Sequence, residues 1–271
     1  MKYIITLMLG CSLMAQQANT TQDTLTANTV ALSSVTVSAL RANEDTPMAF
    51  TNTSEEELNK QNLGKDLPVL LHFLPNVVTT SDAGAGVGYT GIRVRGSDAT
   101  RVNVTINGIA YNDAESHGTF WVNLSDFASS VSDLQLQRGV GTSTNGAAAF
   151  GASLNINTTE PSQDAYALLS SSAGSFNTFK NTVKFSTGLS KSGFEFSGRL
   201  SGITSDGYID RASSNLKGYF LQGTYSSVNT KIKALTFGGH ERTYQAWYGV
   251  TADTLSAVSY THLTLPTIVD V

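Results

Sequence analysis

The sequence predicts an α+β domain followed by antiparallel β-strands of the type found in transmembrane β-barrels. In the first half, helix-capping residues and short alternating runs occur together between residues 51 and 160, which indicates helices beside strands. Beyond Pro161, segments of about ten residues alternate between apolar and polar side chains, and turn residues separate them, as in barrel hairpins with a lipid face and a lumen face. A soluble β-sandwich is the alternative for the second half taken alone.

The composition excludes several classes of protein. The 271 residues carry a net charge of −4, and only 14% of them are charged, against about 25% in ordinary soluble domains. There is no basic patch interleaved with aromatic residues, so nucleic acid is not an expected partner. No apolar run reaches the ~18 residues of a membrane-spanning helix. The single cysteine, Cys11, permits neither an internal disulfide nor a thiol metal site.

The N-terminus reads as an export signal, with Lys2, an apolar run over residues 4–13 and the small residue Ala15, so residues 1–17 are predicted to be a signal peptide. A lipidated Cys11 is the alternative. Residues 18–43 are polar and predicted to be flexible. They contain one alternating patch suited to pairing with a partner's sheet edge or to the first strand of the next domain: Ser34, Val35, Thr36, Val37 and Ser38.

The next elements follow from local signals. Ser54 can cap a helix whose first turn holds three glutamates, and a second short helix is predicted over residues 66–73, before Pro75. Strands are predicted over residues 76–80, 91–96, 101–106, 132–138 and 154–157. Asn107–Gly108 is a hairpin turn signal. The small residues between 139 and 152 allow backbone to pack closely.

About five strands are predicted after residue 161 from the period-two pattern. Residues 179, 183, 185 and 189 share an apolar face, and residues 180, 184 and 186 the polar one; residues 194, 196 and 200 likewise alternate with 195, 197 and 199. The runs 216–226 and 230–241 are also strand-like, but their faces cannot be assigned from the pattern.

Motifs for catalysis are weak. Gly86, Gly88 and Gly91 spell G-x-G-x-x-G, but a strand follows where a dinucleotide site needs a helix. The loop 111–121 combines two carboxylates, one histidine and three aromatic residues; no second histidine or cysteine stands at ligand spacing, so we predict no metal site. No nucleophile–base or paired-carboxylate arrangement indicates an enzyme.

Two segments carry a family resemblance. GIRVRGSDATRVNVTINGIAYND (91–113) and LQLQRGVGTSTNGAAAFGASLNINT (134–158) resemble the plug domain of TonB-dependent outer-membrane receptors. The resemblance implies a plug over residues 44–160 and the start of a barrel over 161–257, about five of the family's twenty-two strands, in a truncated chain. Residues 258–271 lose the alternation, resemble translated adapter sequence and are interpreted as a non-native tail.

The resemblance also implies a function: an outer-membrane transporter with its plug and N-terminus toward the periplasm. Ser34 to Ser38 would be the TonB box, which contacts TonB and, through it, ExbB–ExbD. The cargo would be a small ligand, an iron–siderophore complex; cobalamin, haem, oligosaccharide and a binding-only receptor or adhesin are the alternatives. No cofactor is expected, and outer-membrane lipid would surround the barrel.

Two sets of site residues follow from the same resemblance. The extracellular apex of the plug would bind ligand through Ser81, Asp82, Tyr89, Tyr111, Asn112, Asp113, Glu115 and His117. Arginines in the plug strands would pair with carboxylates of the barrel wall and hold the plug in place, as a latch made of Arg93, Arg95 and Arg138.

Overall fold

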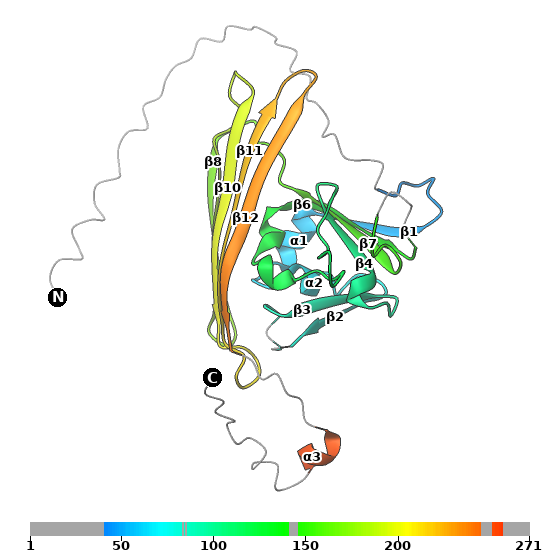
Figure 1. Cartoon of the computed structure of the whole chain (residues 1–271). Helices are drawn as coiled ribbons and strands as arrows, with labels where there is room; N and C mark the ends of the chain where they lie inside the picture. Colours follow the sequence, from blue (N-terminus) through cyan, green and yellow to red (C-terminus); the bar gives the residue numbers. More distant parts are fainter. Residues whose placement is uncertain (1–40, 83, 85, 141–145, 245–250, 257–271) are drawn as a thin grey trace, which may run out of the picture. The chain divides into compact units, whose positions relative to one another are not determined.

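The computed structural model describes residues 41–82, 84, 86–140, 146–244 and 251–256 (Figure 1). The expected signal peptide, the TonB box at Ser34 to Ser38 and residues 258–271 lie outside this part of the chain, as do residues 141–145 of the small-residue run. No helix within the described residues is long and apolar enough to cross a membrane.

The N-terminal domain is built on a five-stranded mixed sheet with the order β1-β6-β7-β4-β5. Its strands are β1 (Ala49–Ser54), β4 (Val102–Ile106), β5 (Ile109–Ala110), β6 (Val131–Arg138) and β7 (Ala152–Thr158). The β4–β7 pair is parallel and the other pairs are antiparallel. A separate two-stranded ribbon consists of β2 (Val77–Ser81) and β3 (Thr90–Val94).

Helices connect these strands. They are α1 (Glu55–Gln61), α2 (Leu67–Leu70) and the 3₁₀ helices η2 (Ala99–Arg101), η3 (Trp121–Asn123) and η4 (Phe127–Ser130). The predicted cap of α1 is confirmed as a capping box: Ser54 Oγ accepts from the Glu57 amide at 3.3 Å, and Glu57 Oε2 accepts from the Ser54 amide at 2.8 Å.

Two expectations for this domain need correction. The helix predicted over residues 66–73 is only α2, because the amides of Leu71 and His72 bond three residues back, to Pro68 and Val69, and tighten the chain into turns. Strand β1 was not predicted because AFTNTS has no apolar alternation, yet it pairs along six residues of β6. The Asn107–Gly108 turn is confirmed, since both residues have positive φ (50° and 82°) between β4 and β5.

The core of the domain lies on the sheet faces. It is formed by aliphatic residues from α1, α2 and the central strands together with Trp121 and Phe127. Burial of these apolar side chains drives the domain together at roughly 25 cal/mol per Å² removed from water. Phe220 of the C-terminal sheet belongs to the same core cluster, and Leu235 and Phe237 pack against it, so the two sheets share apolar contacts.

The C-terminal half is one antiparallel meander of five long strands, ordered β12-β11-β10-β9-β8. They are β8 (Tyr166–Gly174), β9 (Thr178–Ser186), β10 (Phe194–Ser205), β11 (Ser214–Ser226) and β12 (Lys231–Thr243), drawn from green to orange in Figure 1. This confirms the predicted five strands. A short helix, α3 (Ala252–Ser256), follows later in the chain.

The polarity of β9 and β10 is the reverse of that in a soluble protein. On β10, Phe194, Phe196 and Leu200 are 59%, 45% and 53% exposed, whereas Glu195, Ser197 and Arg199 between them are buried. On β9, Phe179 and Val183 are exposed and Lys180 and Thr182 are buried. The predicted faces are therefore confirmed, apart from Leu189, which lies beyond the end of β9 at Ser186. The polar side chains turn toward the N-terminal domain and the apolar ones away from it, as in barrels that face lipid.

Candidate ligand-binding site

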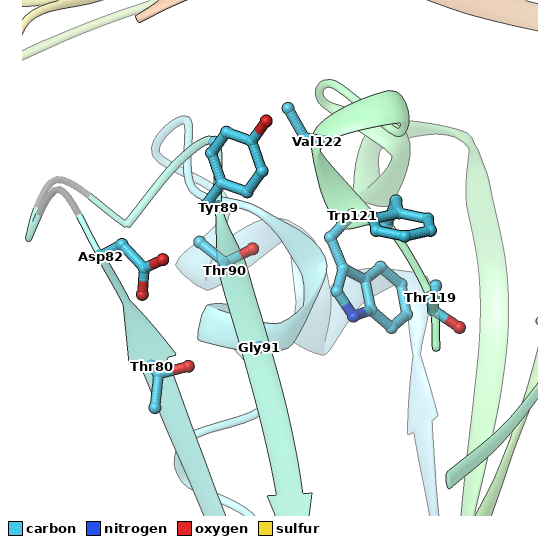
Figure 2. Close-up of a pocket in the computed structure, with 10 residues that line it drawn as sticks. Thr80, Asp82, Tyr89, Thr90, Gly91, Thr119, Trp121 and Val122 are labelled. Atoms are coloured by element: carbon cyan, nitrogen blue, oxygen red, sulfur yellow. The ribbon is translucent and has the colours of Figure 1, made fainter. Parts of the chain in front are cut away.

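A cavity of about 170 Å³ lies where the β2–β3 ribbon meets the segment 119–122; we call it the apex pocket. Figure 2 shows Asp82, Tyr89 and Thr90 of the ribbon side opposite Thr119, Trp121 and Val122. The volume is that of a single ring or a compact polar group. The lining residues are Thr80, Asp82, Gly88, Tyr89, Thr90, Gly91, Thr119, Phe120, Trp121 and Val122.

The structure brings together only part of the predicted ligand set. Asp82 and Tyr89 line the apex pocket. Ser81 instead lines a larger cavity of about 470 Å³ between the ribbon, α2 and the ends of β8 and β10. The loop 111–117 lines neither of these two cavities. The residues shortly after it, Thr119 to Val122, line the apex pocket, although they are not in the predicted ligand set.

The polar groups of that loop mainly fold the loop itself. Asn112 closes it, because its side chain accepts from the Val104 amide at 2.7 Å and donates to the carbonyls of Val102 and His117. Asp113 Oδ1 accepts from the amide and hydroxyl of Ser116. These hydrogen bonds hold the pKa of Asp113 below its ordinary value. Glu115 and His117 are exposed.

The aromatic residues divide between pocket and core. Tyr111 is half-buried and its ring lies 6.1 Å from that of Phe237 on β12, so it contributes to the contact between the two sheets. Trp121 is 3% exposed and belongs to the core, whereas Phe120 is 49% exposed at the edge of the apex pocket. Phe120 and Tyr89 are thus the rings that a ligand can reach.

Two acidic groups lie behind the pocket wall. Asp66 is buried and accepts a hydrogen bond from the Thr90 hydroxyl at 2.9 Å. Burial raises the pKa of Asp66 to about 8 despite that hydrogen bond. Glu241 of β12 has a carboxylate oxygen 2.7 Å from the position that a Cβ atom would take at Gly88, whose φ is +86°. Only glycine fits at this turn beside β12.

The predicted arginine latch stays a prediction. Arg93 and Arg95 are exposed. Arg138 is largely buried, and its guanidinium donates to the Pro75 carbonyl at 2.9 Å and to the Thr51 hydroxyl at 2.7 Å, both within the N-terminal domain. Among the described residues, none of the three arginines forms a salt bridge with β8–β12.

In the ionic contact observed between the two sheets, the N-terminal domain supplies the acid and the C-terminal strands supply the cations. Asp126, fully buried before η4, lies 2.7 Å from Lys180 Nζ of β9 and 3.2 Å from Arg199 Nη1 of β10. Lys180 also donates to the Asn62 side chain and to Ser129. Burial alone would raise the pKa of Asp126, but the charges of Lys180 and Arg199 outweigh it and lower that pKa.

Three more ion pairs, all partly buried, join the halves of the chain. Glu55 at the start of α1 pairs with Lys184 at 3.2 Å, and Glu160 pairs with Lys231 at 2.5 Å and Lys233 at 3.3 Å. Sequence reasoning missed all of these pairs. The alternation of β9 and β10 did place Lys180 and Arg199 on the polar face, but nothing in the local sequence LSDFASS marks Asp126 as their partner.

The comparisons with known proteins fit this arrangement. Residues 42–153 match the model of the TonB-dependent receptor plug domain. The chain therefore contains a TonB-dependent receptor plug. No curated protein matches the sequence. Within the described residues, no group of three or more His, Cys, Asp or Glu side chains is placed to hold a metal ion.

Solved structures share the fold of the plug and of the strands after it. The ferric yersiniabactin uptake receptor FyuA from Yersinia pestis is 14% identical, with a TM-score of 0.57 over 73% of this chain and 32% of its own. The pyoverdine receptor FpvA from Pseudomonas aeruginosa PAO1 is 15% identical, with a TM-score of 0.58 over 71% and 27%. The copper transporter OprC is 16% identical, with a TM-score of 0.61 over 76% and 33%.

The chain thus spans about a third or less of the length of these receptors. It has the fold of a part of these receptors, a plug followed by antiparallel strands, and the described strands of this chain do not close into a barrel. The likeness to the solved structures concerns the fold, and their cargoes differ.

Proposed function

We propose that the protein is an outer-membrane receptor that binds a scarce small ligand, an iron–siderophore complex, and imports it with energy delivered through TonB. The observation that carries this proposal is the reversed polarity of β9 and β10 around a plug domain. Exposed Phe196 and Leu200 suit lipid, whereas the buried cations Lys180 and Arg199 reach the plug. A sheet of this kind is stable only where lipid covers its outer face.

Ligand would bind at the apex pocket, where a carboxylate, hydroxyl groups and two accessible rings converge in a small concave site. The structural relatives include receptors for ferric yersiniabactin and for pyoverdine, which supports a metal chelate as the ligand class. The plug and the N-terminus would face the periplasm, and Ser34 to Ser38 would add as a strand to TonB, coupled to ExbB–ExbD.

The coupling would be a linkage between two faces of the plug. A ligand that binds one conformation more tightly shifts the population toward it, by no more than its differential affinity. Binding at the apex would in this way alter how often the TonB box is available on the other side.

Uptake of radioactive iron tests the proposal directly. Cells that express this chain as part of a receptor with a closed barrel should accumulate ferric siderophore, and such cells without functional TonB should bind the same complex at their surface but not accumulate it. Accumulation that is independent of TonB would contradict energy coupling. Binding without accumulation in both strains would indicate a binding-only receptor instead.

A further inference from the structure

The only charge on the residues that line the apex pocket is negative. Of its ten lining residues, Asp82 carries the only charge, and no lysine, arginine or histidine is among them. Two cations of neighbouring elements lie outside this lining: Lys65 lines the larger cavity, and Arg93 stands two residues beyond Gly91 on β3 without lining the apex pocket. Behind the wall, the Glu241 carboxylate adjoins Gly88. An anionic group would therefore enter against an acidic surface without a charged partner.

The remaining polar side-chain groups of the lining are the hydroxyls of Thr80, Tyr89, Thr90 and Thr119 and the indole N–H of Trp121. Among the described residues, the Thr119 hydroxyl oxygen is buried without a hydrogen-bond partner. A buried polar atom without a partner is unfavourable, and a hydrogen bond from a ligand or water that reached it would relieve this cost.

We propose that the apex pocket selects chelates whose plug-facing group is neutral or positively charged and bears hydrogen-bonding atoms, and that Asp82 and Thr119 are its specificity-determining residues. Hydroxamate chelates of ferric iron have this chemistry, whereas carboxylate chelates such as ferric citrate are anionic. Asp82 attracts the positive end, Thr119 hydrogen-bonds the chelate, and Tyr89 and Phe120 contact its apolar parts. The inference rests on the proposed function and narrows its substrate class.

Equilibrium titration of the full chain in detergent tests the selection. The probes are ferric desferrioxamine B, which is positively charged through its free amine, neutral ferrichrome and anionic ferric citrate. We expect the positive and neutral chelates to bind more tightly than ferric citrate. Asp82→Asn should weaken the positive chelate about two- to five-fold, the range of an exposed ion pair, and leave the neutral one unchanged.

Thr119→Val keeps the shape of the side chain and removes the hydroxyl, so it should weaken all chelates that bind. Thr79→Val is the matched control, because Thr79 is a threonine of β2 that lines the larger cavity instead of the apex pocket. Far-UV circular dichroism checks that each variant is folded; Asp82 is exposed, and Asp82→Asn preserves its size.

The outcomes separate this inference from the proposed function. Tight binding of ferric citrate, weakened by Arg93→Gln and not by Asp82→Asn, would overturn the charge selection while the import role stands. Equal binding of all three chelates to the unchanged chain and to Asp82→Asn would overturn it too. If no chelate binds under any condition, the proposed ligand class fails, and the selection fails with it.

Discussion

The carboxylate of Asp126 in the plug lies 2.7 Å from the ammonium group of Lys180 on β9, and both side chains are at least nine-tenths buried. Arg199 of β10 reaches the same carboxylate. One buried acid therefore holds two buried cations from neighbouring strands, and hydrogen bonds from Lys180 to Asn62 and Ser129 complete the cluster. This group fixes the plug to the first strands of the sheet.

Removal of that acid should be costly. Asp126→Ala leaves Lys180 and Arg199 buried without their counter-charge, and breaking a buried pair in this way costs about 3–5 kcal/mol. Urea unfolding followed by protease digestion measures the loss. The control is Glu56→Ala, whose pair with Lys60 is exposed and should contribute about 0.3–0.5 kcal/mol. Equal losses in the two variants would show that Asp126 does not anchor the plug.

Asp66 should make stability depend on pH. Its folded pKa is about 8 and its ordinary value is 3.8, so the unfolded chain releases a proton that the folded chain keeps. The free energy of unfolding should therefore fall as pH rises from about 4 to 8 and level off above that. The side chain of Asp66→Asn can still accept the hydrogen bond from the Thr90 hydroxyl but does not titrate, so the free energy of unfolding of this variant should depend less on pH. Urea unfolding from pH 4 to 9 checks this, and parallel curves for both proteins would refute it.

The exposed face of β10 should tolerate no charge. Leu200 lies near the middle of that strand and points away from the plug, so Leu200→Arg should cost about 2–4 kcal/mol in a membrane and reduce the protein recovered in outer membranes. Ser192→Arg, in the exposed turn between β9 and β10, is the control and should insert normally. Normal insertion of Leu200→Arg would mean that lipid does not cover this face.

Energy coupling should depend on Val35. Val35→Pro removes a backbone donor that strand addition to TonB requires, so uptake should collapse while ligand binding at the cell surface stays intact. Asn28→Pro, in the same polar segment but before the predicted box, should leave uptake unchanged. If Val35→Pro cells import as well as the parent does, the TonB box lies elsewhere.

Phe120 should contribute to ligand affinity. Its ring is accessible at the edge of the apex pocket, and truncation of an aromatic contact typically costs about 1–3 kcal/mol; Phe120→Ala should weaken binding accordingly. Ile109→Ala is the control, because Ile109 is 74% exposed on β5 and lines no described cavity. Calorimetric titration with ferric desferrioxamine B compares the two variants, and an identical effect would place the ligand away from the pocket.

Local signals predicted much of the fold and less of the site. The cap at Ser54, the turn at Asn107–Gly108 and the faces of β9 and β10 follow from short-range patterns. The faces of β11 could not be assigned because Leu216 and Phe220 lie on its inner side. Phe220 contacts Phe127 of the plug, so an inner position became apolar for a tertiary reason that no single-strand pattern contains.

The same limit explains the site. Asp82 and Tyr89 were predicted from their loop, but the opposite wall, Thr119 to Val122, reaches them only through the folding of η3 against the ribbon. The salt bridges of Asp126 span 54 and 73 residues of sequence, and such pairings depend on the packing of the two sheets. The family resemblance suggested plug arginines as the latch, whereas the cations of the observed cluster, Lys180 and Arg199, come from β9 and β10.

The separation of the β2–β3 ribbon from the main sheet allows it to move without unpairing other strands of the plug. The five residue pairs of the ribbon form a ladder of their own and share none with the five-stranded sheet. A tilt of the ribbon would therefore leave every strand pairing of the main sheet intact, at the cost of the Thr90–Asp66 hydrogen bond and of the apolar contacts of Ile92 and Val94 with the core. Since the ribbon carries one wall of the apex pocket, a ligand that contacted both walls would oppose such a tilt.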